Sequence, residues 1–518
     1  MPPLTTDSHA LSPLLLDGSP LTIEAVDSVA NHGREVALDS GAVARMMQSR
    51  SAVEAACAGD EPRYGINTGF GSLSKQRIPA DELAQLQRNL IRSHAAGIGE
   101  HLAEPIVRGM MLALAASLAR GHSGARPGLV ERLVDMLNAG LTPAVPEVGS
   151  VGASGDLAPL AAVALTLMGE GEVYHKGILR PTAEAFAETG LVAVKLQAKE
   201  GLALINGTHL MAARGALLLA QLPQLFAAAI TTCAMSIDAA LATDAFLDPR
   251  IHAARGQPGQ ADIAAALREA LAGSEILPSH VEDDPRVQDP YSFRCAPPVL
   301  GAALDAARYV KHAIEHELGA VTDNPLVFDN GDIISAGNFH GMPLAIPLDT
   351  LTIALSHIAG ISERRSFAML AASDPACGLT PYLAPKPGVQ SGLMIAQYTA
   401  AACCNEIIGL ATPASVANLS TSAGIEDYNS FGPRAAAKAE RAVWLTRSVV
   451  AIELLCAAQG LDLQRPLRSG AVVEGLHARV RALVPSLQED RPITPDIEAI
   501  TSLLGSPTAA GVLPPPLL

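Results

Sequence analysis

The tripeptide Ala153-Ser154-Gly155 has the residue types from which a protein can build an electrophile out of its own backbone. If the Gly155 nitrogen attacks the Ala153 carbonyl and Ser154 loses its hydroxyl, a methylidene-imidazolone ring forms. Glycine lets the backbone fold back on itself, and Asp156 can transfer the protons that this reaction needs. The segment also fits an ordinary helix start, with Ser154 or Asp156 as the N-cap. A serine hydrolase is excluded, because GxSxG would place its second glycine one position later.

Two other segments carry side chains suited to chemistry. Tyr64 lies in a loop with glycines at 65, 69 and 71, which is typical of a mobile lid. Gln288, Tyr291 and Arg294 follow one another at intervals of three, so on a helical or turn-like segment all three could face one pocket. Arginine suits a bidentate anion, but a lone arginine also commonly forms an inter-helix salt bridge.

A metal site is not predicted. His312, Glu315 and His316 match the HxxEH pattern of inverted zinc peptidases, with both histidines on one helical face. A third ligand has no obvious candidate downstream, and short patterns match by chance, so we interpret this segment as the surface of an amphipathic helix.

Composition excludes several classes of protein. With 49% hydrophobic and 17% charged residues among 518, the chain is not intrinsically disordered. A net charge of −16 without a basic run argues against nucleic acid as a partner. Seven scattered cysteines, none in CxxC, and an N-terminus without a signal pattern predict a cytoplasmic protein without disulfides. Polar residues interrupt the apolar stretch 212–235, which predicts a buried helix and no membrane span.

The fold class predicted is mainly α, with a long central helical bundle and a smaller glycine-rich N-terminal region. Few aromatics and many Ala and Leu residues favour close helix packing. We expect an N-terminal region over 1–200 with short strands at 21–23 and 36–38, a central helical bundle over 201–485, and a terminal helix and Pro-rich tail over 486–518. Helices apolar on several faces need several neighbours, as in a bundle or a tight oligomer. Helical spacing marks residues 102–120, 128–138, 209–230, 298–318, 347–372, 391–411 and 433–459.

Eight sequence blocks, in the same order as in the family, make the chain similar to the aromatic amino acid ammonia-lyases and aminomutases, the histidine ammonia-lyases in particular. The resemblance spans about residues 15 to 510. The blocks are YGINTGFG (64–71), QRNLIRSHAAGIGE (87–100), PAVPEVGSVGASGDLAPL (143–160), INGT (205–208), QDPYSFRCAP (288–297), VTDNPLVF (321–328), GNFHG (337–341) and TSAGIEDYNSFG (421–432).

The resemblance implies a role for each candidate residue. It implies an ammonia-lyase fold, a 4-methylidene-imidazol-5-one group formed autocatalytically from residues 153–155 without an external cofactor, and a homotetramer whose active sites are shared between chains. Tyr64 would be the base for the β-proton and Arg294 the clamp for the substrate carboxylate. The implied catalytic residues are Tyr64, Ala153, Ser154, Gly155, Tyr291 and Glu426, with Asp156 in ring formation and His94, Asn206, Gln288, Arg294 and Phe339 in substrate binding.

Two positions bear on the amino acid substrate. Ser93-His94 and Glu426 match the pattern of the family's histidine-specific members, which implies elimination of ammonia from L-histidine to give urocanate. The alternative is a lyase or 2,3-aminomutase for another aromatic or imidazole-bearing amino acid. A third hypothesis is a homologue that has lost catalysis and serves as a binding or scaffold subunit. The intact Tyr64, Ser154, Asn206 and Arg294 argue against it. The chain departs from the histidine pattern at Ile408, Thr412, Ile425 and Tyr428.

Overall fold

The chain divides into two compact units, each built from several stretches of sequence. The computed structural model describes residues 12–59, 61–71, 76–282, 284–373, 375–506, 513 and 517–518. The first unit comprises 1–220, 311–348 and 414–437, and the second 221–310, 349–413 and 438–518, as far as these residues are described. The predicted division of the sequence at residues 200 and 485 stays a prediction, because these units follow packing and not chain order. Four helices contribute residues to both units: α9 (His209–Ala239), α14 (Ala296–Glu317), α15 (Met342–Ala371) and α17 (Gly432–Leu463).

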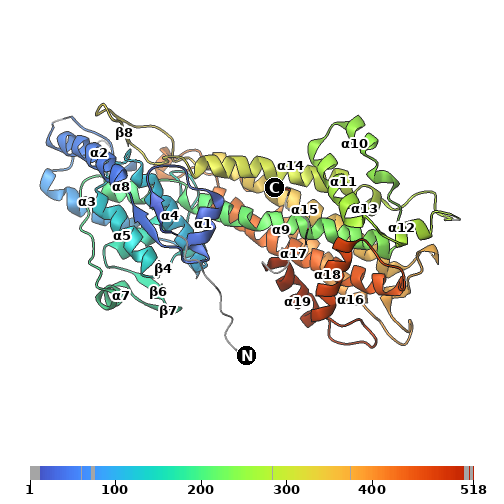
Figure 1. Cartoon of the computed structure of the whole chain (residues 1–518). Coiled ribbons are helices and arrows are strands. Elements are labelled where there is room, and N and C mark those ends of the chain that lie inside the picture. The colour runs from blue at the N-terminus through green and yellow to red at the C-terminus, as the bar shows by residue number, and fades with distance from the viewer. Residues whose placement is uncertain are drawn as a thin grey trace. The chain divides into compact units, whose positions relative to one another are not determined.

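The first unit consists of helices with small sheets between them (Figure 1). β1 (Leu14–Leu16) pairs in parallel with β2 (Val36–Leu38), and the other pairs are antiparallel: β3 (Ile98–His101) with β5 (Pro146–Val148), β6 (Glu172–His175) with both β4 (Leu141–Pro143) and β7 (Ile178–Pro181), and β8 (Leu326–Val327) with β9 (Ile333–Ile334). The helices lying wholly in this unit are α1 (Ile23–Ala30), α2 (Ser40–Ala58), α3 (Leu83–His94), α4 (Glu104–Ala119), α5 (Pro127–Asn138), α6 (Leu157–Leu167), α7 (Thr182–Thr189) and α8 (Glu200–Ile205).

Of the two short strands expected near the N-terminus, one is correct and one is wrong. Val36–Leu38 forms β2 as predicted. Leu21 and Thr22 are not in a strand, and Ile23 begins α1. The reason is that Thr22 is an N-cap, whose side-chain oxygen accepts the N–H of Ala25 at 3.1 Å.

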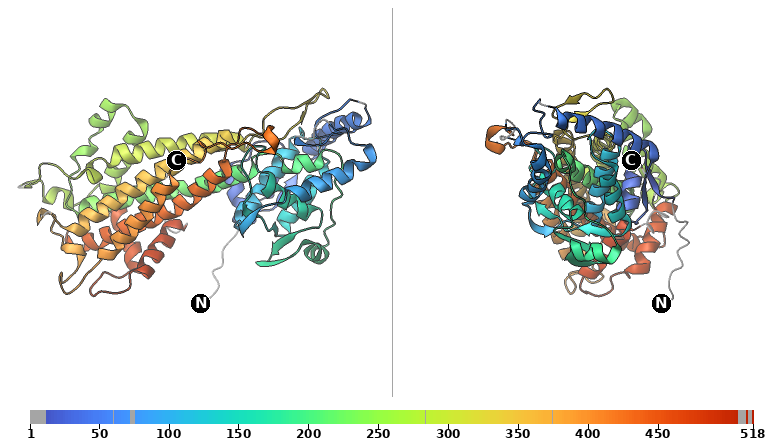
Figure 2. Two further views of the ribbon diagram at one scale, coloured as in Figure 1. Left: turned by 180° about the vertical axis from the view of Figure 1, so that it is seen from behind. Right: turned by 90° about the vertical axis from the view of Figure 1, so that its left-hand side faces the viewer.

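The second unit is a bundle in which the long helices lie side by side (Figure 2). At its centre Arg365 of α15 and Glu453 of α17 form an ion pair with both side chains fully buried. Ser236 of α9 and Ser362 of α15 donate to the same Glu453 carboxylate, so one charged group joins three helices. The remaining helices of this unit are α10 (Pro249–Arg255), α11 (Pro258–Leu271), α12 (Ile276–Ser279), α13 (Tyr291–Arg294), α16 (Met394–Leu410), α18 (Ala471–Leu483) and α19 (Thr494–Gly505).

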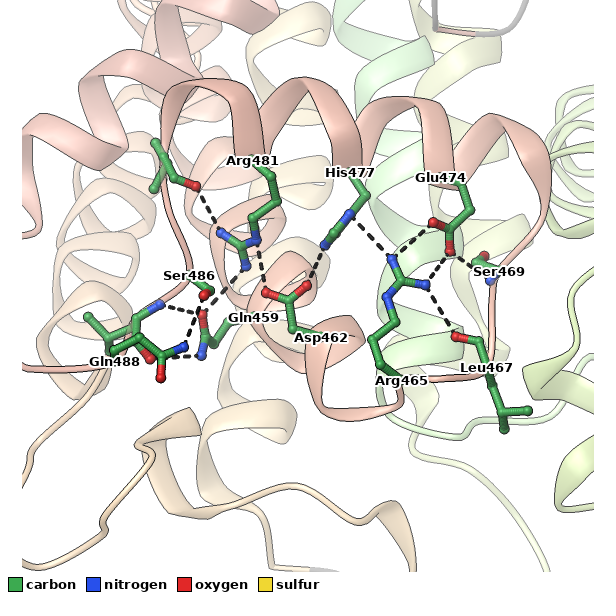
Figure 3. A network of polar contacts seen from close by, with 12 residues as sticks. Gln459, Asp462, Arg465, Leu467, Ser469, Glu474, His477, Arg481, Ser486 and Gln488 are labelled. Carbon is green, nitrogen blue, oxygen red and sulfur yellow. Dashed lines mark hydrogen bonds and ion pairs between the residues drawn. The ribbon is translucent and has the colours of Figure 1, made fainter.

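A polar network joins the end of α17 to α18 (Figure 3). Asp462 accepts from His477 Nε2 at 2.7 Å and from Arg481 Nε at 2.9 Å. Arg465 donates to both oxygens of Glu474, at 2.7 and 2.9 Å. A bidentate arginine fixes distance and angle together, so these pairs orient α18 relative to the residues at and just after the end of α17.

Each of the seven spans predicted from helical spacing overlaps a helix, namely α4, α5, α9, α14, α15, α16 and α17, and α9, α15 and α17 extend several residues beyond their predicted bounds. Among the described residues, α9, α15 and α17 are long and apolar enough to cross a membrane by length and composition alone. Their most apolar windows are 78%, 61% and 89% buried inside the protein. The stretch 212–235 lies within α9, where its side chains pack against other helices.

Candidate active site

A cavity of about 560 Å³ lies in the first unit, and most of the candidate residues line it. Its wall combines the loop before α6, the end of α8, the end of α3 and the segments 335–340 and 422–428. The loop of Tyr64 and the residue Asn324 complete the wall, so the structure brings together residues from seven separate parts of the sequence. The candidates on this wall are Tyr64, His94, Ala153, Ser154, Asn206, Phe339 and Glu426.

The loop that carries Ala153-Ser154-Gly155 is held against the segment before α9. Asp156 N–H donates to the Gly207 carbonyl at 2.7 Å, and Gly207 N–H donates to the Ser154 carbonyl at 3.3 Å. Gly155 has φ +74°, and a Cβ there would lie 2.0 Å from the Gly207 oxygen. Only glycine therefore fits at position 155.

The two hydrogen bonds to Gly207 form a first clamp on this loop, and a second clamp holds the residues before the tripeptide. Ser430 Oγ donates to the Gly152 carbonyl at 2.9 Å, and Gly341 N–H donates to the same oxygen at 3.3 Å. Phe431 N–H donates to the Val151 carbonyl at 2.9 Å. The loop is therefore fixed on both sides of the tripeptide by residues distant in sequence, which restricts the conformations that it can adopt.

Asp156 is fully buried beneath the tripeptide. Its Oδ2 accepts the N–H groups of Leu210 at 2.9 Å and Met211 at 3.2 Å, in the first turn of α9. Burial raises the pKa of Asp156 to about 7, although these N–H donors and Arg214 oppose the shift. A carboxyl group with this pKa can both release and take up a proton at neutral pH.

Asn206 follows the last residue of α8 and lies against the tripeptide. With its amide nitrogen toward the loop, Asn206 donates to the Ser154 carbonyl at 3.0 Å, and its amide oxygen accepts the N–H of Asn324 at 2.9 Å. The Ser154 oxygen thus has two donors, Asn206 Nδ2 and Gly207 N–H. Two donors on one carbonyl withdraw electron density from it.

His94 is the last residue of α3, and the structure defines its tautomer. Its Nδ1 lies 2.8 Å from the Leu90 carbonyl oxygen and 3.1 Å from Ser93 Oγ. A carbonyl oxygen only accepts, so Nδ1 carries the hydrogen and, in the neutral ring, Nε2 keeps a lone pair. His94 therefore offers a hydrogen-bond acceptor to a ligand in the cavity.

Tyr64 and Glu426 interact electrostatically across the cavity wall. The Tyr64 hydroxyl accepts the N–H of Gly71 at 3.4 Å, and Thr421 Oγ1 donates to Glu426 Oε2 at 3.3 Å. Burial raises the pKa of the Tyr64 phenol, and the negative charge of Glu426 adds to this effect. A cation placed beside the phenol would lower its pKa again.

Gln288, Tyr291 and Arg294 lie together as their spacing predicts, but in the second unit. Arg294 Nη2 donates to Gln288 Oε1 at 2.7 Å, and the guanidinium lies 4.5 Å from the centre of the Tyr291 ring. The three side chains line a cavity of about 460 Å³. The candidate residues thus fall into two groups, each complete within its own unit.

Several residues of the first cavity had no role in the sequence prediction. Asn324 and His340 lie in blocks that the resemblance used, VTDNPLVF and GNFHG, and membership in those blocks was the only signal for them. His340 Nε2 donates to the Tyr428 carbonyl at 3.0 Å. Ile425 and Tyr428, two of the departures from the histidine pattern, are on the cavity wall, whereas Ile408 and Thr412 belong to the second unit.

The HxxEH segment lies on α14 with both histidines exposed. His316 Nδ1 donates to the His312 carbonyl at 2.7 Å, a bond between one turn of the helix and the next. Over the described residues, no group of three or more His, Cys, Asp or Glu side chains is arranged to hold a metal ion.

Comparison with known proteins defines the class. A family described as aromatic amino acid lyase matches residues 21–482, and the chain belongs to this family. A histidine ammonia-lyase of Anaeromyxobacter sp. (strain K) is 49% identical over 500 residues, 95% of this chain and 98% of that protein. One from Deinococcus radiodurans is 48% identical over 479 residues, 92% of this chain and 91% of that protein.

Solved structures agree with this family. The crystal structure of histidine ammonia-lyase from Trypanosoma cruzi superposes with a TM-score of 0.89 at 37% identity, covering 97% of this chain and 96% of that one. Tyrosine aminomutase from Streptomyces globisporus superposes with a TM-score of 0.90 at 35% identity, covering 96% and 98%. These matches confirm the resemblance, the mainly α fold and the prediction that the protein is a lyase.

Proposed function

We propose that the protein is a histidine ammonia-lyase, which removes ammonia from L-histidine without oxidation and releases urocanate. The observation that carries the proposal is the single cavity lined by Tyr64, His94, Ser154, Asn206 and Glu426. The relatives named histidine ammonia-lyase support it, because they match nearly the whole chain at 45–49% identity.

The tripeptide fits a methylidene-imidazolone group. Closure of the ring joins the Gly155 nitrogen to the Ala153 carbonyl carbon and releases two molecules of water. One takes the Ala153 oxygen with the amide hydrogens of Gly155 and Ser154, and the other takes the Ser154 hydroxyl with its Cα hydrogen. Three features suit this closure: the absence of a Cβ at Gly155, the clamps on both sides of the loop, and the buried Asp156 carboxyl that exchanges protons. The group would supply an electrophile for the substrate amine, and Asn206 and Gly207 would hold its oxygen.

His94 and Glu426 recognise the substrate ring in this proposal. Each presents a hydrogen-bond acceptor in the cavity, His94 through Nε2 and Glu426 through its carboxylate. An imidazole ring has an N–H to donate, whereas a benzene ring has none and would leave buried acceptors unpaired. Phe339 supplies an apolar face beside the tripeptide.

Tyr64 removes the β-proton in this proposal. Without substrate its pKa is raised, so the phenol is protonated at neutral pH. The ammonium group of a bound amino acid brings the positive charge that lowers this pKa, and the base is then generated where the substrate lies. Mutation of Glu426 to Gln removes a negative charge and should ease ionisation of Tyr64.

Arg294, with Gln288 and Tyr291, binds the substrate carboxylate in this proposal. A planar guanidinium is suited to a bidentate carboxylate, and the Tyr291 ring supports it from one face. We propose a homotetramer in which a neighbouring chain contributes this trio to the cavity. Large apolar side chains exposed on α16 support an oligomer: Ile395, Tyr398 and Ile408 are each at least 60% exposed in the single chain. The scattered free cysteines support a cytoplasmic location.

The second candidate is a lyase or 2,3-aminomutase for another aromatic amino acid. It is favoured by Ile425 and Tyr428, which give part of the cavity wall an apolar and phenolic character. The similarity to tyrosine aminomutase supports it as well.

One assay separates the candidates. The purified protein is incubated with histidine, tyrosine and phenylalanine, and the ultraviolet absorbance of the unsaturated acid is followed together with ammonia and β-amino acid. We expect histidine to give urocanate and an equimolar amount of ammonia, and we expect no product from tyrosine or phenylalanine. A β-amino acid, or turnover of tyrosine in preference to histidine, would favour the second candidate.

A further inference from the structure

A buried ion pair lies beside Asn206, and neither of its two residues is on the cavity wall. Lys199 immediately precedes α8, and its Nζ lies 2.6 Å from Asp323 Oδ2, with both side chains almost completely buried. Replacing such a pair by apolar side chains of similar volume often costs no stability, so stability alone does not account for it. Lys199 also has φ +68°, a left-handed conformation that is unfavourable for a lysine. Strained residues of this kind cluster at functional sites.

The second oxygen of Asp323 leads toward the cavity. Asp323 Oδ1 accepts the N–H of Asn324 at 2.6 Å. The Asn324 side chain accepts from Ala336 N–H at 2.7 Å and from Ser335 Oγ at 3.1 Å, and all three of these residues are on the cavity wall. Asp323 thus connects the buried lysine to the segments that line the cavity.

The Asn206 amide has two possible orientations at this point. In one, its nitrogen donates to the Ser154 carbonyl at 3.0 Å and its oxygen accepts from Asn324 N–H at 2.9 Å. In the other, its nitrogen faces Asp323 Oδ1 at 3.4 Å and the Asn324 carbonyl at 3.3 Å. The first orientation has the shorter bonds, but an uncompensated negative charge on Asp323 would attract the amide hydrogens toward the second.

We propose that Lys199 is a positioning residue that neutralises Asp323 and thereby keeps the Asn206 amide nitrogen on the Ser154 carbonyl. This inference rests on the proposed function, because the oxygen that Asn206 holds belongs to the ring that we propose. Lys199 touches neither the cavity nor the tripeptide, and it acts only through Asp323 and Asn206. The positive charge of Lys199 thus compensates the negative charge of Asp323, and the Asn206 amide keeps the orientation in which its nitrogen donates to the Ser154 carbonyl.

The test measures the rate of ring formation and does not depend on the rate of turnover. The chain is made by cell-free synthesis, the folded fraction is isolated at intervals, and its intact mass is measured for the loss of two waters. Lys199→Met removes the charge at similar side-chain length and should slow this loss roughly tenfold, the equivalent of about one hydrogen bond. Lys199→Gln, which can still donate to Asp323 but has no charge, should slow it similarly and is the variant of choice if Lys199→Met does not fold.

Two controls separate positioning from a general loss of stability. Lys438→Met breaks another buried Lys–Asp pair, with Asp349 at 3.0 Å in the second unit, and should lower thermal stability while the two waters are lost at the wild-type rate. In an Asn206→Ala background, Lys199→Gln should have no further effect. Ring formation at the wild-type rate in folded Lys199→Gln, or equal slowing with and without Asn206, would overturn the inference. Absence of the mass loss from the wild-type chain would instead contradict the proposed function.

Discussion

Asp156→Asn should change how the stability of the protein depends on pH. Burial raises the pKa of Asp156 from 3.8 to about 7 in the folded chain. A raised pKa means that the folded state binds the proton more tightly than the unfolded state does. Its contribution to stability is therefore fully present below pH 3.8 and is lost as the pH rises through about 7.

The size of the effect follows from this shift. A difference of about 3 pKa units corresponds to about 4 kcal/mol, with a slope of about 1.4 kcal/mol per pH unit between the two pKa values. From pH 5 to pH 8 the free energy of unfolding of the wild type should fall by about 3 kcal/mol through this group alone. Asparagine has nearly the same shape and can still accept the N–H groups of Leu210 and Met211, but it does not titrate.

The assay is urea unfolding of both proteins from pH 5 to pH 8 at one fixed protein concentration, because assembly changes apparent stability. The quantity of interest is the difference in the free energy of unfolding between wild type and Asp156→Asn at each pH. This difference should shift by about 3 kcal/mol in favour of the variant as the pH rises. A difference in the free energy of unfolding that stays constant from pH 5 to pH 8 would show that Asp156 titrates outside this pH range. The proton-transfer role that we assign to it would then lose its basis.

Three other substitutions test the site directly. Ser154→Ala should abolish ammonia release, and the intact mass of the variant should show that the two waters are not lost. Its unfolding midpoint should stay unchanged, because the substitution opens little cavity. Turnover close to that of the wild type would exclude the internal ring as the catalytic group. Gly155→Ala should prevent ring formation and destabilise the loop, since the added Cβ would lie 2.0 Å from the Gly207 oxygen, and an intact-mass measurement with normal loss of water would refute this geometry. His94→Leu should lower activity on histidine relative to phenylalanine by roughly ten- to a hundredfold, because the imidazole N–H loses an acceptor in a desolvated pocket. Equal loss on both substrates would make His94 structural.

Local sequence patterns predict much of the helical structure. Apolar spacing locates α4 within two residues at its start and one at its end. The tripeptide loop can be selected as a candidate from sequence alone, because the chemistry proposed for it depends on neighbouring residues. The strand expected at residues 21–23 is wrong, because a threonine in an apolar stretch fits either a strand or an N-cap, and only the neighbouring helix decides between them. Spacing also indicates that Gln288, Tyr291 and Arg294 lie together.

Other features depend on contacts that no local pattern records. The two compact units interleave along the chain, so a boundary in sequence does not describe them. The pairing of Lys199 with Asp323 joins residues 124 positions apart, and each residue alone is typical of an exposed surface. The tautomer of His94 follows from the carbonyl of Leu90 one helical turn earlier, which sequence allows but does not require.

The clamp on the tripeptide loop has a consequence for biosynthesis. The hydroxyl of Ser430 that holds the Gly152 carbonyl lies 278 residues further along the chain. At the usual speed of translation, the ribosome needs on the order of 15 to 60 s to reach it after it has made the loop. During that time the tripeptide has left the ribosome without this clamp, as an ordinary stretch of peptide. In the proposed function, the nascent chain therefore carries no preorganised electrophile while it is still unfolded, and ring formation waits for the last segment of the first unit.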